Sequence, residues 1–164
     1  MIKGYVRPSV PKDPEKVAPI LRDLDKAEID ATAGLDHAVA LSYAMQSCIL
    51  PLTIVDDNEE PFAMFGVNNH PSIEEYGQIW LLSSDYLFKA KMPFLRQSKL
   101  WQEAIEQPYS VVGNLVSEVN IKHIRWLKWL GYRFIARHPE FGFTKQPFLE
   151  FVRITECAHS SCLL

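Results

Sequence analysis

The sequence predicts a mixed α/β domain with a largely antiparallel sheet and a few crossover helices. Apolar, β-like runs recur along the chain, and segments with apolar residues at helical spacing separate them. Proline or glycine stands at most of the boundaries. The resulting order is β-α-α-β-β-β-α-β-α-β-β. We expect residues 1–156 to form one domain and residues 157–164 to be a flexible tail.

Size and composition restrict the class of protein. A chain of 164 residues that is 48% hydrophobic and 23% charged is typical of one globular domain with a sizeable core. The net charge of −3 gives no basic field, so we predict no nucleic-acid partner. No apolar run approaches the roughly 20 residues that span a bilayer. The N-terminus lacks the apolar core of a signal peptide, so we expect an intracellular protein.

The first third of the chain predicts a strand and two helices. Tyr5–Arg7 is β-like, and Asp13, followed by Pro14-Glu15, is typical of a helix start. Pro19 interrupts the apolar pattern of that helix, which therefore kinks or begins later. Residues 23–30 carry charges of both signs and are expected to be exposed. A second helix follows Asp36.

The middle and last thirds predict the rest of the sheet. Residues 52–55 and 62–67 form a hairpin around a polar turn, and residues 78–82 are apolar on both faces, as in a central strand. The remaining predicted elements are a helix at 94–105, a strand at 110–119, a helix at 121–130 that stops at Gly131, a strand at 132–136, a polar and aromatic loop at 138–146, and a strand at 148–154.

Several of these segments resemble the GCN5-related N-acetyltransferases. Tyr5-Val6-Arg7-Pro8 with Asp13 is similar to their first strand and helix start, and the hairpin ending in Phe62–Val67 is similar to their second and third strands. Their closing pattern is matched by Asn120, Leu130, Gly131 and Tyr132. The order of elements agrees over nearly the whole chain. The resemblance implies an acetyltransferase-like mixed, mostly antiparallel sheet flanked by helices.

The chain also resembles, more narrowly, a family of small acetyltransferase-like proteins of short-tailed bacteriophages. Ile79–Asp85, Asn120–Leu127 and Pro147–Arg153 carry this resemblance. It implies an internal virion or morphogenesis protein, located in the virion or the host cytoplasm, whose partners are other phage structural proteins. Fold alone does not determine function.

Two departures from the acetyltransferase pattern predict a protein without catalytic activity. The enzymes follow their central strand with a glycine-rich loop whose amides bind the pyrophosphate of acetyl-CoA. Here Asp85–Phe94 contains no glycine, and Pro93 removes an amide donor. The enzymes also commonly place a proton-donating tyrosine seven residues after the asparagine, where this chain has Leu127. Tyr132 matches a structural aromatic instead. We therefore expect no cofactor.

The alternative function is an active, acetyl-CoA-dependent N-acetyltransferase that modifies a protein or a small amine. In that case the resemblance implies acetyl-CoA between the strands at 78–83 and 110–118, with Ser83 and Asn120 beside it. Ser117 and Glu118, at the end of the second strand, are then the candidate catalytic residues. A solvated carboxylate at the end of a strand is the simpler explanation of Glu118. A third reading is a sensor that binds the cofactor without turnover.

The helix at 121–130 is a candidate partner surface. Trp126 and Trp129 are three residues apart and share a broad helix face. A basic ridge lies along the same helix: Lys122, Arg125 and Lys128. Aromatic and basic side chains together are typical of interface hot spots. The alternative is that both tryptophans pack in the core. His123 is expected near the basic face.

The cysteines predict no metal site. Cys157, His159 and Cys162 are close in sequence and are suitable ligands for a soft metal, but no fourth ligand is nearby. Cys48 ends an apolar stripe and is expected to be a packed core thiol.

Overall fold

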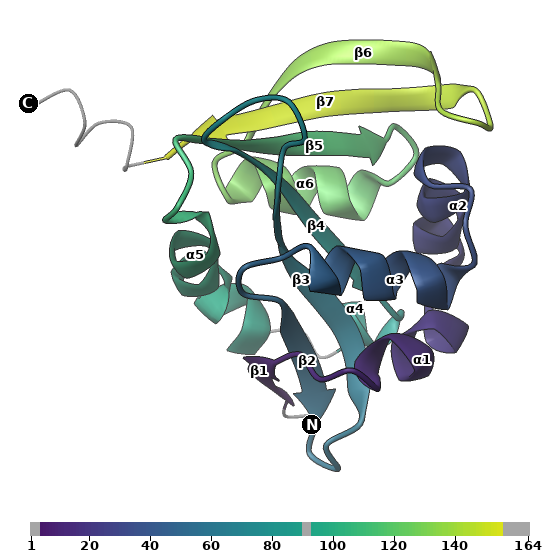
Figure 1. Cartoon of the computed structure of the whole chain (residues 1–164), viewed down its shortest axis with the longest axis vertical. Coiled ribbons are helices and arrows are strands. Elements are labelled where there is room, and N and C mark those ends of the chain that lie inside the picture. The colour runs from purple at the N-terminus through teal and green to yellow at the C-terminus, as the bar shows by residue number, and fades with distance from the viewer. Residues whose placement is uncertain (1–3, 90–92, 156–164) are drawn as a thin grey trace, which may run out of the picture.

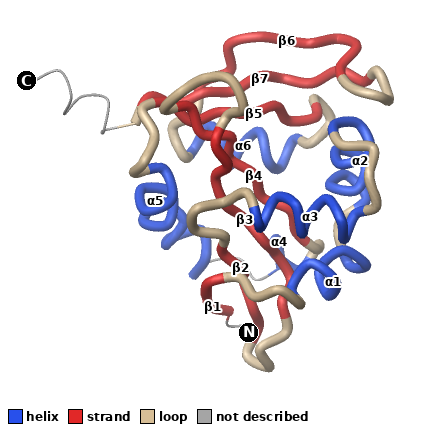
Figure 2. Tube along the Cα trace, in the orientation of Figure 1, coloured by secondary structure: helices blue, strands red, loops and turns tan. Residues whose placement is uncertain are grey.

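The fold is a single seven-stranded sheet with helices on both faces (Figures 1 and 2). A computed structural model describes residues 4–89 and 93–155. In chain order the elements are β1 (Gly4–Pro8), α1 (Asp13–Val17), the 3-10 helix η1 (Ala18–Ile20), α2 (Asp23–Thr32), α3 (His37–Gln46), β2 (Leu52–Asp56), β3 (Pro61–Asn69), β4 (Tyr76–Ser83), α4 (Tyr86–Lys89), α5 (Pro93–Glu106), β5 (Val111–Ser117), α6 (Ile121–Trp129), β6 (Arg133–Phe141) and β7 (Gln146–Ile154).

The strand order is β1-β2-β3-β4-β5-β7-β6, and only one neighbouring pair is parallel. That pair is β4 and β5, which α4 and α5 connect as a crossover. All other neighbours are antiparallel. The predicted mixed, mostly antiparallel sheet flanked by helices is therefore confirmed.

The sheet separates two hydrophobic cores, because successive side chains of a strand point to opposite faces. On one face Met64 of β3 packs with α1 and α3. On the other face Phe65, the next residue, packs with α6, and so do Ile79 and Leu81 of β4. In Figure 1, α3 crosses in front of β3 and β4, whereas α6 lies behind β5.

The segment at 13–32 agrees with the prediction in one respect and differs in another. The expected interruption at Pro19 is confirmed, because the segment is divided into α1, η1 and α2, with Pro19 inside η1. The expectation that residues 23–30 are exposed is wrong for Asp25 and Ile29, which are buried, although Asp23 and Asp30 are exposed. Mixed charges suggested a solvated helix, but α2 packs one face against the ends of the central strands.

The C-terminal hairpin is longer than predicted. β6 continues to Phe141 and pairs with β7 through His138↔Phe148 and Phe141↔Gln146, so most of the expected loop at 138–146 is strand. The predicted left-handed stop at Gly131 is confirmed by its φ of 94°. Among the described residues no helix is long and apolar enough to cross a membrane. The predicted tail at 157–164 lies outside the described residues.

Candidate functional site

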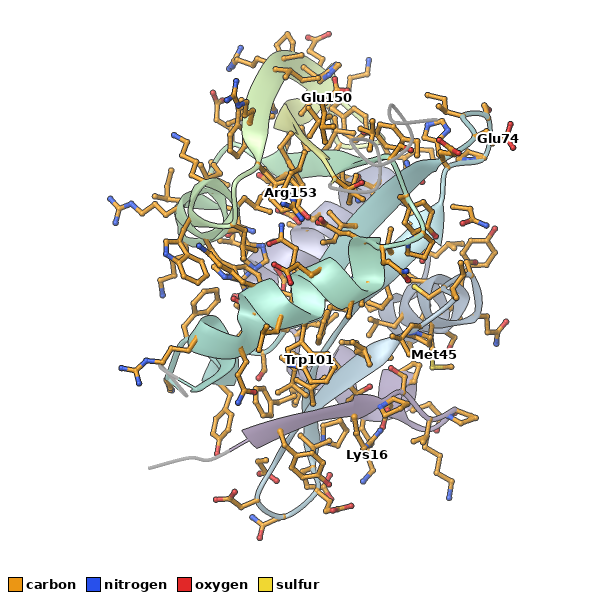
Figure 3. The ribbon with its side chains drawn as sticks, turned by 90° about the vertical axis from the view of Figure 1, so that its left-hand side faces the viewer. Lys16, Met45, Glu74, Trp101, Glu150 and Arg153 are labelled. Carbon is orange, nitrogen blue, oxygen red and sulfur yellow. The ribbon has the colours of Figure 1, made fainter. Side chains whose placement is uncertain are left out.

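The two central parallel strands separate soon after they meet. β4 and β5 pair only from Tyr76↔Val111 to Gln78↔Gly113, and Figure 1 shows β5 then turning away from β4. A largely apolar cavity of about 420 Å³ fills the gap, with walls from α2 and α3 on one side and from α5 and α6 on the other. Trp101, on the side of α5 that faces the strands in Figure 3, lines it.

Helix α2 binds the ends of both diverging strands through two carboxylates. Asp25 Oδ2 accepts the backbone N–H of Ser83, the last residue of β4, at 2.8 Å. Glu28 Oε1 accepts the backbone N–H of Ser117, the last residue of β5, at 3.1 Å. Residues three apart lie on the same face of a helix. One face of α2 therefore binds the ends of β4 and β5, where the two strands are no longer paired with each other.

A buried arginine compensates the charge of Asp25. The Arg22 Nη2 atom lies 2.5 Å from Asp25 Oδ1, and both side chains are buried. The backbone N–H of Arg22 also donates to the carbonyl of Ser83 at 2.9 Å. Burial raises the pKa of Asp25, while the hydrogen bond and the charge of Arg22 oppose that change. The guanidinium lies 4.7 Å from the ring centroid of Phe88 in α4.

Glu28 belongs to a second polar group at the start of α6. The Asn120 amide Nδ2 lies 3.0 Å from Glu28 Oε1 and 3.1 Å from His123 Nδ1. His123 Nε2 in turn lies 3.2 Å from Arg22 Nη2. Because burial disfavours a charge, the pKa of Glu28 is raised to about 7 and that of His123 is lowered to about 3. Arg22, Asp25, Glu28, Asn120 and His123 thus form one connected network.

Backbone groups in and after β4 also form hydrogen bonds within the protein. The Asn114 amide Nδ2 donates to the carbonyl of Ile79, inside the gap, at 2.8 Å. The N–H of Ser84 donates to Phe62 at 2.9 Å. Further donors to internal acceptors are the N–H groups of Tyr86, Leu87 and Phe88. Most of the amides that would have to face a phosphate group after the central strand therefore already have partners.

The two predicted catalytic candidates lie at the end of β5, away from the cavity wall. Glu118 receives two hydrogen bonds from Arg137, at 2.9 and 3.0 Å, and its side chain is 38% exposed. The hydrogen bond from Arg137 lowers the pKa of Glu118. Ser117 is buried and reaches the network through its backbone N–H. The carboxyl group on the cavity wall is Glu28.

The two predicted cofactor contacts lie in the network. Ser83 and Asn120 are both fully buried. The N–H of Ser83 is bonded to Asp25, and the side-chain amide of Asn120 is bonded to Glu28. Neither residue lines the cavity. The expectation that His123 lies near the basic face is wrong, because it is buried with Ile124 and Leu127 on the inner face of α6.

The position at which the acetyltransferases commonly carry a proton-donating tyrosine holds an apolar side chain in this protein. Leu127 is buried and lines the cavity. Tyr132 is also buried, and its hydroxyl donates to Glu106, which accepts two further bonds from Arg153. Burial and the charge of Glu106 raise the pKa of Tyr132. The hydroxyl of Tyr132 therefore lies in a hydrogen-bonded cluster apart from the cavity.

The predicted partner surface on α6 is divided between core and solvent. Trp126 is partly buried and lines the cavity, whereas Trp129 is half exposed. The exposed cations of the same helix are Lys122, Arg125 and Lys128. Cys48 is only partly buried and contacts Asn68 and Trp80, at 2.6 and 3.3 Å. Cys157, His159 and Cys162 lie outside the described residues.

Sequence reasoning missed three charged residues at the start of α2. Asp25 and Glu28, three residues apart, form one row on the helix, and Arg22 directly precedes the helix as its N-cap. That spacing was visible, but nothing in the sequence showed that this row faces the gap between two strands.

Comparison with known proteins gives a phage family and an enzyme fold. A family model described as "Bacteriophage T7, probable scaffold protein Gp13" matches residues 72–141, which is less than half of the chain. No curated protein matches the sequence.

Solved acetyltransferases share the fold at low identity. The ribosomal-protein-S5-alanine acetyltransferase of Vibrio fischeri is 12% identical with a TM-score of 0.65, and the match covers 93% of both chains. The spermidine N-acetyltransferase of Vibrio cholerae, solved with CoA and spermine, is 8% identical with a TM-score of 0.67, over 95% of this chain and 98% of that one. Ard1 of Thermoplasma volcanium is 19% identical with a TM-score of 0.65, over 93% and 97%. The chain therefore has the acetyltransferase fold, and these identities say nothing of its reaction.

Proposed function

We propose that this protein is a phage virion-associated or assembly protein that is catalytically inactive and acts through contacts with other phage proteins. The observation that carries the proposal is the occupation of both diverging strand ends by α2. Asp25 and Glu28 accept the last N–H groups of β4 and β5, and the N–H groups that follow β4, where a cofactor's phosphates would bind, also donate to acceptors of the protein. The match to a phage scaffold family supports the assembly role.

Electrostatics adds to the same argument. A diphosphate bound after β4 would lie near Asp25, whose carboxylate approaches Ser83 to 2.8 Å. The charge of Arg22 is already paired with this carboxylate, so the site offers a diphosphate no free cation unless the ion pair breaks. A diphosphate that displaced Asp25 from Arg22 would leave the Asp25 carboxylate as a buried charge without its partner, and breaking a buried ion pair in this way costs about 3–5 kcal/mol.

The second candidate function, an active N-acetyltransferase, is favoured by one observation. Glu28 lies on the wall of a cavity in the gap between β4 and β5, and its pKa of about 7 is suitable for a general base that accepts a proton from an amine. Leu127 lies on the wall of the same cavity, and its side chain has no group that can protonate a leaving thiolate.

A turnover assay separates the two functions. The purified full chain is mixed with acetyl-CoA at millimolar concentration and with a panel of amines that includes spermidine and an N-terminal alanine peptide. Release of CoA is followed with a thiol reagent. We expect no release above the rate of spontaneous hydrolysis. Turnover that is abolished in Glu28→Gln but retained in Glu15→Gln, an exposed glutamate of α1, would overturn the proposal.

The assembly role has its own test. Mass spectrometry of purified particles and of assembly intermediates of the phage that encodes the protein should detect it in at least one of them. Its absence from both would contradict an assembly role, whatever the turnover assay shows.

A further inference from the structure

The outer surface of α5 and α6 carries an unusual concentration of positive charge. Five cations are exposed on these two helices: Arg96, Lys99, Lys122, Arg125 and Lys128. Glu103 is the one exposed carboxylate on them, because Glu106 is buried against Arg153. None of the five cations forms an ion pair with a described residue. This is notable in a chain whose net charge is −3.

Aromatic rings hold three of these cations in place. Lys99 Nζ of α5 lies 4.5 Å from the ring centroid of Trp129 on α6, which also shows that the two helices are neighbours at this point. Two further lysines lie over rings, Lys122 at 5.0 Å from Phe88 and Lys128 at 5.6 Å from Phe134. A side chain fixed before binding loses less conformational entropy when a partner arrives.

Apolar side chains are exposed among the cations. Leu100 on α5 is 67% exposed, and Ile121 and Trp129 on α6 are 53% and 50% exposed. An interface core contains aromatic and aliphatic anchors inside a polar rim. Phosphate backbones make no use of leucine or isoleucine, since binding to nucleic acid depends on cations and on stacking of bases on aromatic rings. The mixture therefore favours a protein partner over a nucleic acid.

We infer that the α5–α6 face, formed by Arg96, Lys99, Lys122, Arg125, Lys128 and Trp129, is the docking surface for an acidic protein segment that carries apolar side chains. The inference rests on the proposed function and names the chemistry of its partner. Charge complementarity selects the partner. Trp129 supplies the apolar anchor. Both helices lie within residues 72–141, the part of the chain that matches the phage scaffold family.

A short fluorescein-labelled peptide of alternating glutamate and leucine serves as the probe, and fluorescence anisotropy with the full chain measures its binding. We expect binding at low salt that weakens strongly near 1 M salt, where the Debye length is about 3 Å. A peptide with glutamine in place of glutamate, and a single-stranded oligonucleotide of equal charge, should bind at least about tenfold more weakly. No binding of the acidic peptide at millimolar protein, or tighter binding of the oligonucleotide, would overturn the inference.

Two sets of charge reversals locate the surface. The combined Lys122→Glu, Arg125→Glu and Lys128→Glu variant should lose peptide binding, while the matched variant with Lys12, Lys26 and Lys145 changed to Glu should keep it. Trp129→Ala should weaken binding by about tenfold or more, as expected for an anchor residue. Each variant is first shown to have the circular dichroism spectrum and unfolding midpoint of the wild type. Equal losses in the two triple variants would overturn the inference.

A competition experiment keeps this inference distinct from the proposed function. Acetyl-CoA at millimolar concentration should not displace the peptide. Displacement would show that the basic face binds phosphates and would overturn this inference, while the turnover assay would still decide the proposed function. Absence of peptide binding together with absence of acetyl-CoA binding would overturn this inference alone.

Discussion

Replacing Glu28 by glutamine removes a titrating carboxyl from the network and keeps an acceptor for the Ser117 N–H. In the folded protein the pKa of Glu28 is about 7, against an ordinary value of 4.5. The folded state therefore holds this proton more tightly than the unfolded state. Its contribution to stability is present at low pH and is lost as the pH rises through 7. The loss amounts to about 2.5 kcal/mol between about pH 5 and pH 8.

His123 acts in the opposite direction over the same range. Its pKa is about 3 in the folded protein against an ordinary 6.5, so the unfolded state takes up the proton first. Stability from the neutral imidazole is present above the ordinary value and falls as the pH decreases, by about 2 kcal/mol from about pH 8 to pH 5. In the wild type the contributions of the two residues nearly cancel, so together they change the free energy of unfolding little over this pH range.

In the Glu28→Gln variant, the contribution of His123 to the pH dependence of stability should therefore no longer be cancelled. Urea unfolding at several pH values should show its free energy of unfolding rising with pH relative to the wild type, by about 2–3 kcal/mol between about pH 5 and pH 8. His123→Gln should show the opposite slope. Glu15→Gln, at an exposed site on α1, is the matched control and should leave the profile unchanged. Identical pH profiles for Glu28→Gln and the wild type would refute the raised pKa of Glu28.

Two further substitutions test the packing that positions α2 and the N-terminal strand. Asp13→Asn should destabilise the fold by about 3 kcal/mol, since Asp13 is buried and accepts two bonds from Arg7, at 2.8 and 2.9 Å; a cost below about 1 kcal/mol in urea unfolding would contradict this. Gly142→Ala should destabilise more than Gly131→Ala in thermal unfolding, because a Cβ on Gly142 would lie 2.0 Å from the Ala31 carbonyl oxygen, whereas one on Gly131 meets its nearest neighbour at 3.8 Å; equal losses would show that the contact between the β6–β7 turn and α2 is not formed.

Local sequence patterns predicted much of the fold. The hairpin at 52–67, the central strand and the unit from Asn120 to Gly131 were all predicted from periodicity and turn residues, and the structure confirms them. Strand ends were less accurate. β6 was predicted to end at residue 136 but reaches Phe141, because its pairing with β7 continues through a polar segment that has no strand pattern of its own.

The candidate site was predicted only in part. Ser83, Ser117 and Asn120 were placed near the gap, and all three belong to the network that the structure shows there. Asp25 and Glu28 were not foreseen, because a charged helix normally faces water. Their burial depends on the divergence of β4 and β5, which exposes backbone N–H groups that need acceptors. Such a need arises between distant segments and leaves no signal in the local sequence.

The two tryptophans of α6 show the same limit. Their spacing left open whether both pack in the core, and only the position of α5 decides it. Trp126 lies against the cavity, while Trp129 lies at the outer edge beneath Lys99. The sequence proposed this helix as a candidate surface, but it did not show that Lys99 of α5 lies beside it.

We propose that carboxylates of α2, in place of a cofactor, occupy the ends of β4 and β5. This claim is tested most directly by the backbone amide signals of Ser83 and Ser117 in the nitrogen-15 spectrum of the full chain, recorded with and without millimolar acetyl-CoA. Because these amides are bonded to Asp25 and Glu28, we predict slow hydrogen exchange and no change in either signal. A shift of both signals that saturates with acetyl-CoA would contradict the claim.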